Sequence, residues 1–144
     1  LWVVTIILTF VIMEFVAWFS HKYIMHGFLW SLHRDHHIKK HNSWFERNDF
    51  FFIFYAIVSF GFALLWGQYS IWIGLPIAIG IFLYGLTYFL VHDIFIHQRF
   101  KIFRNTNSKY AKGIRRAHKI HHKNINKDKS ECFGMLWVPL KYLK

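Results

Sequence analysis

Histidines at repeated spacings are the residues in this sequence best suited to chemistry. The chain has 144 residues and 11 histidines, and ten of these histidines fall into four clusters. The clusters follow two patterns, His-x4-His and His-x2-His-His, which alternate along the chain so that each occurs twice. The ten residues are His21 and His26; His33, His36 and His37; His92 and His97; and His118, His121 and His122. Only His41 lies outside the pattern.

Ten imidazoles brought together point to bound metal. Without a cation their nitrogen lone pairs would stay unsatisfied, and protonated rings would repel one another as like charges. Imidazole binds metals of borderline softness such as iron, zinc, copper and nickel. One such ion takes about four to six ligands, so ten histidines suit two ions. Zinc would supply Lewis-acid or hydroxide chemistry and iron would add oxygen chemistry, and the spacing does not choose between them.

The two patterns place different demands on the backbone. In a helix, the members of each His-x2-His-His triplet lie at i, i+3 and i+4 and project from one face. The members of each His-x4-His pair are five residues apart, which is about 140° on a regular α-helix. We therefore expect the helix that carries each pair to end, unwind or bulge between its two histidines.

Three acidic residues are candidates for orienting the histidines. Asp35 and Asp93 lie beside histidines and could accept a hydrogen bond from the second ring nitrogen, with direct ligation or a surface salt bridge as alternatives. Glu14 precedes His21 by seven residues, two helical turns on the same face, and its alternative role is a partnered structural carboxyl. The sequence has no Glu-x2-His pair, which excludes the di-iron bundle built on that motif.

The composition indicates a membrane protein. The chain is 55% hydrophobic, yet its formal net charge is +11. All 18 lysines and arginines lie within residues 22–47 or from Arg99 onward, which is the positive-inside pattern with both basic segments on the cytoplasmic side. Anionic membrane lipids account for this charge, so we expect no nucleic-acid partner. The single cysteine, Cys132, excludes an internal disulfide and zinc sites built on several cysteines.

Three apolar runs are long enough to cross a membrane, since roughly 20 helical residues span the hydrocarbon. They occupy about residues 1–20, 50–66 and 71–91. A turn over 67–70 would join the second and third runs as a hairpin, and a break near Pro76 and Gly80 would add a fourth span. We predict a single-domain, all-α integral membrane protein over residues 1–144, with three to four transmembrane helices.

The remaining segments, 21–49 and 92–144, are polar and basic and carry the histidine clusters. We expect them to form a histidine-rich helical cap at the cytoplasmic face of the membrane. Gly27 should break or bend the first span directly after His26, because glycine tolerates non-helical torsion angles.

Within the cap, the pattern predicts short elements. We expect a helix over 33–40, a loop over 42–49 with Asn48 or Asp49 as a candidate N-cap for the helix that follows, and a helix over 111–123 that carries the last triplet. The apolar stretch 133–143 is too short to span a membrane. It should lie in the interface or fold back over the cap.

At these residues the sequence resembles the bacterial-type beta-carotene hydroxylases of the fatty acid hydroxylase and sterol desaturase superfamily, whose four histidine boxes come in the same order. The matching stretches are residues 21–27, similar to the first box, 88–93 and 97–100, similar to the third, and 117–122, similar to the fourth. Glu46, Asn48 and Asp49 sit as in that family's first loop, and residues 132–134 resemble its C-terminal end.

The resemblance implies an integral membrane monooxygenase with a non-haem di-iron centre, which zinc can replace in a purified sample. By this likeness, all ten clustered histidines would be metal ligands. The implied reaction converts beta-carotene through beta-cryptoxanthin to zeaxanthin. It would consume dioxygen and electrons delivered by ferredoxin and ultimately NAD(P)H. The implied location is the inner membrane, with the metal site on the cytoplasmic side.

Two other functions remain open at the level of sequence. One is a fatty acyl or sterol hydroxylase or desaturase of the same superfamily. The other is a non-enzymatic membrane protein that binds metal, which should have a polar path across its spans; apart from Glu14 and a few hydroxyl groups, the apolar runs offer none. A carotenoid such as beta-carotene carries no polar group. The carotenoid hydroxylase function therefore requires an apolar pocket that opens to lipid.

Overall fold

The computed structural model describes residues 1–39, 43–126 and 128–144, and the regular structure within these ranges is helical. The helices are α1 (Trp2–Phe19), η1 (Ser20–Phe28), α2 (Trp30–His37), α3 (Asp49–Tyr69), α4 (Gly74–Tyr88), η2 (Phe89–Ile96), α5 (Lys109–Lys123) and η3 (Leu140–Tyr142). The π-helices η1 and η2 continue directly from α1 and α4, whereas η3 is a short 3-10 helix. The predicted all-α fold is confirmed.

Three helices in the described residues are long and apolar enough to cross a membrane. They are the continuous helix Trp2–Phe28, α3, and the continuous helix Gly74–Ile96. Pro76 stands in the first turn of α4, where its missing N–H breaks no helical hydrogen bond. Gly80 lies inside the same unbroken helix. The third apolar run is therefore one span, and no fourth span is present in the described residues.

The second span is longer than the sequence predicted. α3 covers the 21 residues Asp49–Tyr69, so residues 67–69, expected in a turn, are helical. The helix ends at Ser70, which has a left-handed φ of 53°, and the Ile71 N–H donates to the Leu65 carbonyl at 3.1 Å. The predicted hairpin of the second and third spans is present, and its turn lies a few residues later than expected.

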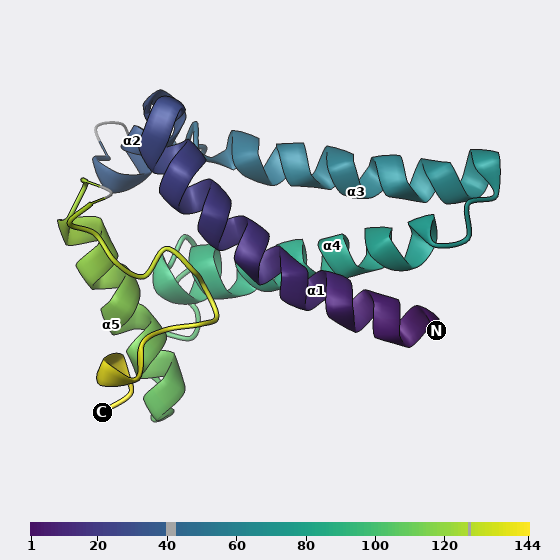
Figure 1. Ribbon diagram of the computed structural model, residues 1–144. Coiled ribbons are helices and arrows are strands. Elements are labelled where there is room, and N and C mark those ends of the chain that lie inside the picture. The colour runs from purple at the N-terminus through teal and green to yellow at the C-terminus, as the bar shows by residue number, and fades with distance from the viewer. Residues whose placement is uncertain (40–42, 127) are drawn as a thin grey trace.

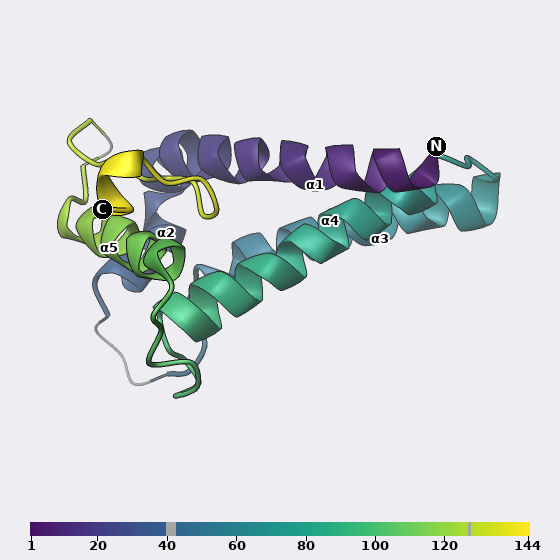
Figure 2. The same ribbon diagram turned by 90° about the horizontal axis from the view of Figure 1, so that it is seen from below.

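The three spans lie side by side, with α3 antiparallel to α4 and α1 crossing α4 (Figure 1). Two glycines permit this close packing. A Cβ atom at Gly80 would lie 2.6 Å from the Thr9 Cβ on α1, and a Cβ atom at Gly74 would lie 2.5 Å from the Phe62 carbonyl oxygen on α3. Toward its C-terminal end α1 diverges from α4, and the histidine-rich cap occupies that end of the spans (Figure 2).

The sequence predicted that the C-terminal stretch would lie in the interface or over the cap. In the structure the C-terminal segment, residues 132–139, packs on α5 through Val138, as a fold over the cap requires, and it also folds back against α1, which was not predicted (Figure 2). Glu14 fixes it there. One Glu14 oxygen accepts the backbone N–H groups of residues 135–137 at 2.9, 2.8 and 3.0 Å, and the other accepts the Tyr84 hydroxyl at 2.7 Å. Met135 thereby joins the buried core between α1 and α4.

The cap consists of α2, α5 and the C-terminal segment, at the end of the spans away from the N-terminus (Figure 1). α2 covers Trp30–His37 rather than the predicted 33–40, and Ile38 already has non-helical torsion angles; the predicted end at Lys40 lies outside the described residues. α5 begins at Lys109, two residues earlier than predicted. The assignment of the cap to the cytoplasmic side stays a prediction.

Candidate metal centre

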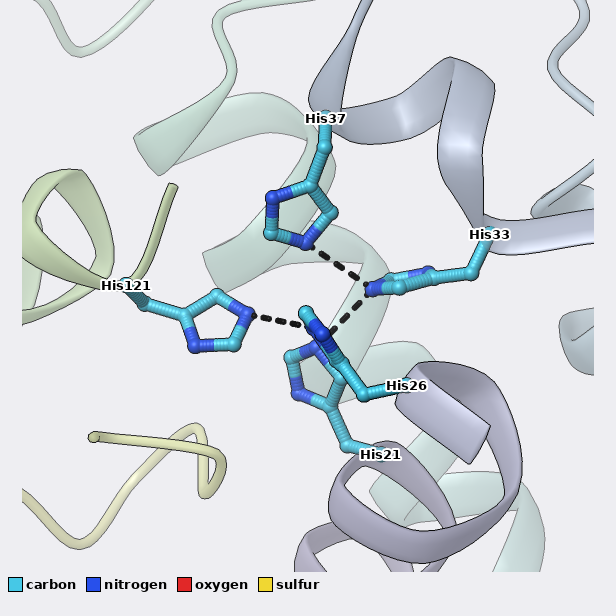
Figure 3. Close-up of side chains that lie close together, drawn as sticks. All are labelled: His21, His26, His33, His37 and His121. Atoms are coloured by element: carbon cyan, nitrogen blue, oxygen red, sulfur yellow. Dashed lines mark hydrogen bonds between the residues drawn. The ribbon is translucent and has the colours of Figure 1, made fainter. Parts of the chain in front are cut away.

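Nine of the ten predicted histidines form two groups, within each of which the possible ligand nitrogens all lie within 4.8 Å of one another. Group A comprises His21, His26, His33, His37 and His121 (Figure 3). Group B comprises His36, His97, His118 and His122. The tenth, His92, adjoins group B, because its ring centroid lies 4.5 Å from that of His97 and 4.8 Å from those of His36 and His118.

The π-helices explain how residues five apart can converge. A π-helix joins residue i to residue i+5 by a backbone hydrogen bond, so its wider turn brings such residues into line. The His97 N–H donates to the His92 carbonyl at 2.9 Å, which is this bond between the two members of a pair. After His26, Gly27 departs from helical torsion angles (φ −107°, ψ −125°), as predicted, and the chain turns into α2. The expected bulge is thus a π-helical segment in each case.

The two groups draw on the sequence pattern in opposite ways. Both histidines of η1 belong to group A, and His97 at the end of η2 belongs to group B. α2 gives the outer histidines of its triplet to group A and the middle one, His36, to group B. α5 does the reverse, with its middle histidine, His121, in group A. Each triplet therefore connects both groups, whereas the pair His21 and His26 belongs to group A alone and His97 belongs to group B, with His92 beside it.

Hydrogen bonds fix the tautomers of several rings. Nδ1 of His21, His26 and His121 lies 2.9, 2.9 and 3.1 Å from the backbone carbonyl oxygens of residues 133, 125 and 131. Nδ1 of His33 lies 2.6 Å from Asn48 Oδ1. Because these oxygens can only accept, Nδ1 must carry the hydrogen, and the neutral ring keeps a lone pair on Nε2.

The Nε2 atoms so defined face one another across group A. His21 Nε2 lies 3.0 Å from His33 Nε2, and His26 Nε2 lies 3.1 Å from His121 Nε2. Two lone pairs at this distance repel unless a cation lies between them. Nitrogens bound at about 2.1 Å to one ion are about 3.0 Å apart at right angles and about 3.4 Å apart in a tetrahedron. The observed spacing thus suits neighbouring ligands of an ion with more than four ligands.

Group B also contains imidazole nitrogens that face each other or have no hydrogen-bond partner. Its His97 and His118 Nε2 atoms lie 2.8 Å apart. Nε2 of His36 and of His122 are buried and have no hydrogen-bond partner within the described ranges. Buried polar atoms are normally satisfied, so such nitrogens indicate an absent ligand. The residues present therefore fit a metal ion in each group.

Burial keeps these imidazoles neutral. Loss of solvation lowers the pKa of His33 to about 3, and the same cause lowers the pKa values of His97 and His121 to about 3. Neighbouring histidines add to the effect, because a second positive ring nearby disfavours protonation. Neutral imidazole is the form that binds metal, so the groups are ready to take up ions at physiological pH.

The three acidic candidates occupy different positions. Asp93 adjoins His92, with 3.3 Å between the carboxylate and Nδ1, as expected for an orienting partner. Asp35 accepts the Arg47 backbone N–H at 2.7 Å. It does not face the histidines of its own helix, because residues one or two apart in a helix point in different directions. The hydrogen bonds of Glu14 run to Tyr84 and the C-terminal segment instead of to a histidine, which supports its alternative role as a partnered structural carboxyl.

Several orienting partners were not assigned a role from the sequence. Glu46 accepts the His36 Nδ1–H at 2.8 Å. Asn48 occupies the N-cap position of α3, as predicted, but its side chain accepts from His33 and makes no cap hydrogen bond. Arg99 joins this network, with contacts of 3.1 Å to Glu46 and 3.3 Å to Asp93. Glu46 stood out only through the family resemblance, Asn48 also as a candidate N-cap, and the backbone carbonyls carry no sequence signal at all.

An apolar cavity of about 280 Å³ lies between α1, α3 and α4 and adjoins group A. Its lining includes His21 of group A, Asn48, which binds His33, and Asp93, which adjoins His92. The rest of the lining is mainly apolar and aromatic, including Met13, Phe52, Ala56, Ile81, Leu86 and Phe89. Such a cavity can hold an apolar ligand beside the histidine groups.

Comparisons with known proteins agree with this site. The family model described as "Fatty acid hydroxylase" matches residues 6–140. The chain belongs to the fatty acid hydroxylase family and is thus an oxidoreductase of the hydroxylase type in a membrane.

Within this family, the chain is similar to proteins named beta-carotene hydroxylase. It is 36% identical over 142 residues to that of Pantoea ananas, covering 96% of this chain and 80% of the relative. It is 33% identical over 138 residues to that of Paracoccus sp. (strain N81106 / MBIC 01143), covering 93% and 82%. The chloroplastic beta-carotene 3-hydroxylase 2 of Arabidopsis thaliana is 34% identical over 131 residues, covering 88% and 42%. No solved structure matches the chain.

Proposed function

We propose that this protein is a beta-carotene 3-hydroxylase, which converts beta-carotene through beta-cryptoxanthin to zeaxanthin. The observation that carries the proposal is the pair of histidine groups beside an apolar cavity, in a chain similar over most of its length to beta-carotene hydroxylases. Dioxygen and electrons from a ferredoxin-type donor, ultimately from NAD(P)H, complete the proposed reaction.

The proposed cofactor is a pair of iron ions, one held by group A and one by group B, with His92 as a further ligand of group B. Bound there, the two ions would supply the activation of dioxygen. Iron suits the site because four pairs of facing nitrogens lie 2.8–3.1 Å apart, closer than the ligands of tetrahedral zinc, as in an ion with more than four ligands. Asn48, Glu46 and the backbone carbonyls keep the imidazoles in the tautomer that a metal needs.

The cavity is the proposed site for one ring of the carotenoid. At about 280 Å³ it lies at the small end of ligand pockets, so it suits a ring and not the whole molecule. The polyene would then extend from the cavity into the lipid around the spans. Met13, Phe52 and Phe89 offer contacts of shape alone, as a hydrocarbon substrate requires, and they exclude water from the reacting end.

The basic cap is the proposed docking face for the electron donor. α5 presents Lys112, Arg116 and Lys119 on its exposed side, while His118 and His121 lie buried on the other. An acidic donor docked there would be one helix away from both groups. This arrangement supports placing the cap in the cytoplasm, beneath the inner membrane.

The test is expression in a host that accumulates beta-carotene, followed by chromatography of the pigments. We expect beta-cryptoxanthin and zeaxanthin from the native chain. His36→Ala and His121→Ala, one in each group, should abolish both products while the protein still inserts into the membrane, because insertion depends on the apolar spans. If the metal-loaded native protein leaves beta-carotene unchanged but alters fatty acyl or sterol lipids, the substrate is another lipid of the superfamily.

A further inference from the structure

Equivalent histidines of the two groups have unlike partners. His21 and His92 are the first members of the two His-x4-His pairs, and His121 and His36 are the middle members of the two triplets. On the group A side, His21 and His121 donate from Nδ1 to backbone carbonyl oxygens at 2.9 and 3.1 Å. On the group B side, the partners are carboxylates, with Asp93 at 3.3 Å from His92 and Glu46 at 2.8 Å from His36. Within the described part of the chain, these two histidines are the ones with a carboxylate partner.

Arg99 forms ion pairs with both of these carboxylates, Asp93 and Glu46. Its Nε lies 3.3 Å from Asp93, and its Nη2 lies 3.1 Å from Glu46 and 2.7 Å from Asp49. The side chain is only 10% exposed. Its position is fixed by the end of η2, where Gln98 has a left-handed φ of 53° and the Arg99 N–H donates to the Asp93 carbonyl at 2.9 Å.

The cluster carries more negative than positive charge. Three carboxylates, those of Glu46, Asp49 and Asp93, share one buried guanidinium. Lys39 approaches Glu46 at 3.7 Å, but its side chain is 55% exposed and its charge is screened by solvent. A carboxylate that accepts the Nδ1–H of a metal-bound imidazole raises the basicity of that ligand more than a neutral carbonyl does.

We propose that group B is the tighter of the two metal positions and fills first. Arg99 acts as its positioning residue, holding Glu46 and Asp93 against His36 and His92. The inference rests on the metal centre of the proposed function. It adds that the two ions are held unequally, although their histidine sets are related by the repeated sequence pattern.

The test is a titration of metal-free protein in detergent with cobalt(II), in competition with a chelating dye. We expect two classes of site in the native protein, one tight and one weak. His97→Ala should remove the tight class, and His26→Ala should remove the weak class. If the two classes are equal in affinity, or if His26→Ala removes the tight one, the proposal is wrong.

Arg99→Lys keeps the charge but loses the fork that spans several carboxylates. We expect it to weaken the tight class roughly 10–100-fold and to leave the weak class unchanged, because orienting partners of metal ligands have effects of that size. Glu46→Gln, a smaller change, should weaken the same class. Arg104→Lys, on the exposed stretch beyond η2, is the matched control and should change neither class.

These outcomes separate two failures. If Arg99→Lys and Glu46→Gln weaken both classes alike, or neither, while the variants retain helical circular dichroism, the positioning role fails and the metal centre stands. If the native protein binds no cobalt at all, the metal centre of the proposed function fails with it.

Discussion

His21 Nε2 lies 3.0 Å from His33 Nε2, although both imidazoles carry their hydrogen on Nδ1. This contact looks like a hydrogen bond by distance, yet neither neutral ring has a proton to place between the two nitrogens. The chain thus holds two lone pairs against each other at close range. Holding them there destabilises the metal-free protein, and bound metal removes the repulsion.

Metal removal should therefore lower the thermal stability of the protein. A ligand that binds only the folded state adds about 2.7 kcal/mol when its free concentration is about 100-fold above Kd. We expect treatment with a chelator to lower Tm in detergent, and added iron(II) or cobalt(II) to restore it. An unchanged Tm, with metal removal verified by elemental analysis, would contradict this role of the histidine groups.

The stability of the metal-free protein should fall as the pH is lowered. His33, His97 and His121 have folded-state pKa values of about 3, below the value of about 6.5 expected in the unfolded chain. Between these values the unfolded state binds more protons, so acid favours unfolding by up to about 1.4 kcal/mol per pH unit for each residue. Tm should be lower at about pH 5 than at about pH 7.5, and the opposite trend would be incompatible with neutral buried rings.

Glu14 should matter more for the C-terminal segment than for the histidines directly. Glu14→Leu leaves three backbone N–H groups and the Tyr84 hydroxyl without their acceptor, so we expect a loss of roughly 3 kcal/mol in unfolding free energy. The segment also holds the Phe133 carbonyl that accepts from His21, so metal content should fall as well.

Glu14→Gln is the matched control, because its amide oxygen can still accept the N–H groups. It should lower the unfolding free energy and the metal content less than Glu14→Leu does. Gly134→Ala tests the same contact from the other side, since its Cβ would lie 2.9 Å from Glu14 Oε1. Equal effects of Glu14→Leu and Glu14→Gln would show that the negative charge, and not the acceptor, is what matters.

Filling the cavity should impair catalysis and spare the metal. Gly85 lines the cavity, and a Cβ there meets only the Phe52 ring, at 3.8 Å, in ordinary contact. We expect Gly85→Leu to reduce zeaxanthin formation severalfold or more while metal content stays the same. Gly61→Leu is the control, because nothing lies within 4 Å of its Cβ and Gly61 is outside the lining. Normal turnover by Gly85→Leu would show that substrate binds elsewhere.

The sequence was sufficient to predict the spans and the gathering of the histidines into groups that could hold metal ions. Hydropathy and charge segregation report directly on a membrane, and ten histidines outnumber the ligands of one ion. It was less reliable at ends of elements. α2 begins at Trp30 rather than at 33, and α3 extends through residues expected to turn, because packing in the cap and a left-handed Ser70 determine where those helices begin and end.

The division of the histidines into two groups was beyond prediction from spacing. His33 and His36 share one helix, yet packing against α5 and the two π-helices sends them to different groups. The orienting partners were equally hidden. Three are backbone carbonyls, which every residue has, and Asn48 fits the pattern of a helix cap as well as that of a histidine partner.

The π-helical form of η1 and η2 makes the length of each segment a functional property in its own right. Deleting one residue between His21 and His26, or between His92 and His97, would leave four-residue spacing and let the chain relax into the more stable α-helix. That gain in local backbone stability would rotate every residue beyond the deletion by about 100° relative to the span below it. In these two turns the protein keeps a less favourable backbone, and the extra residue is what brings the two histidines of each pair into line.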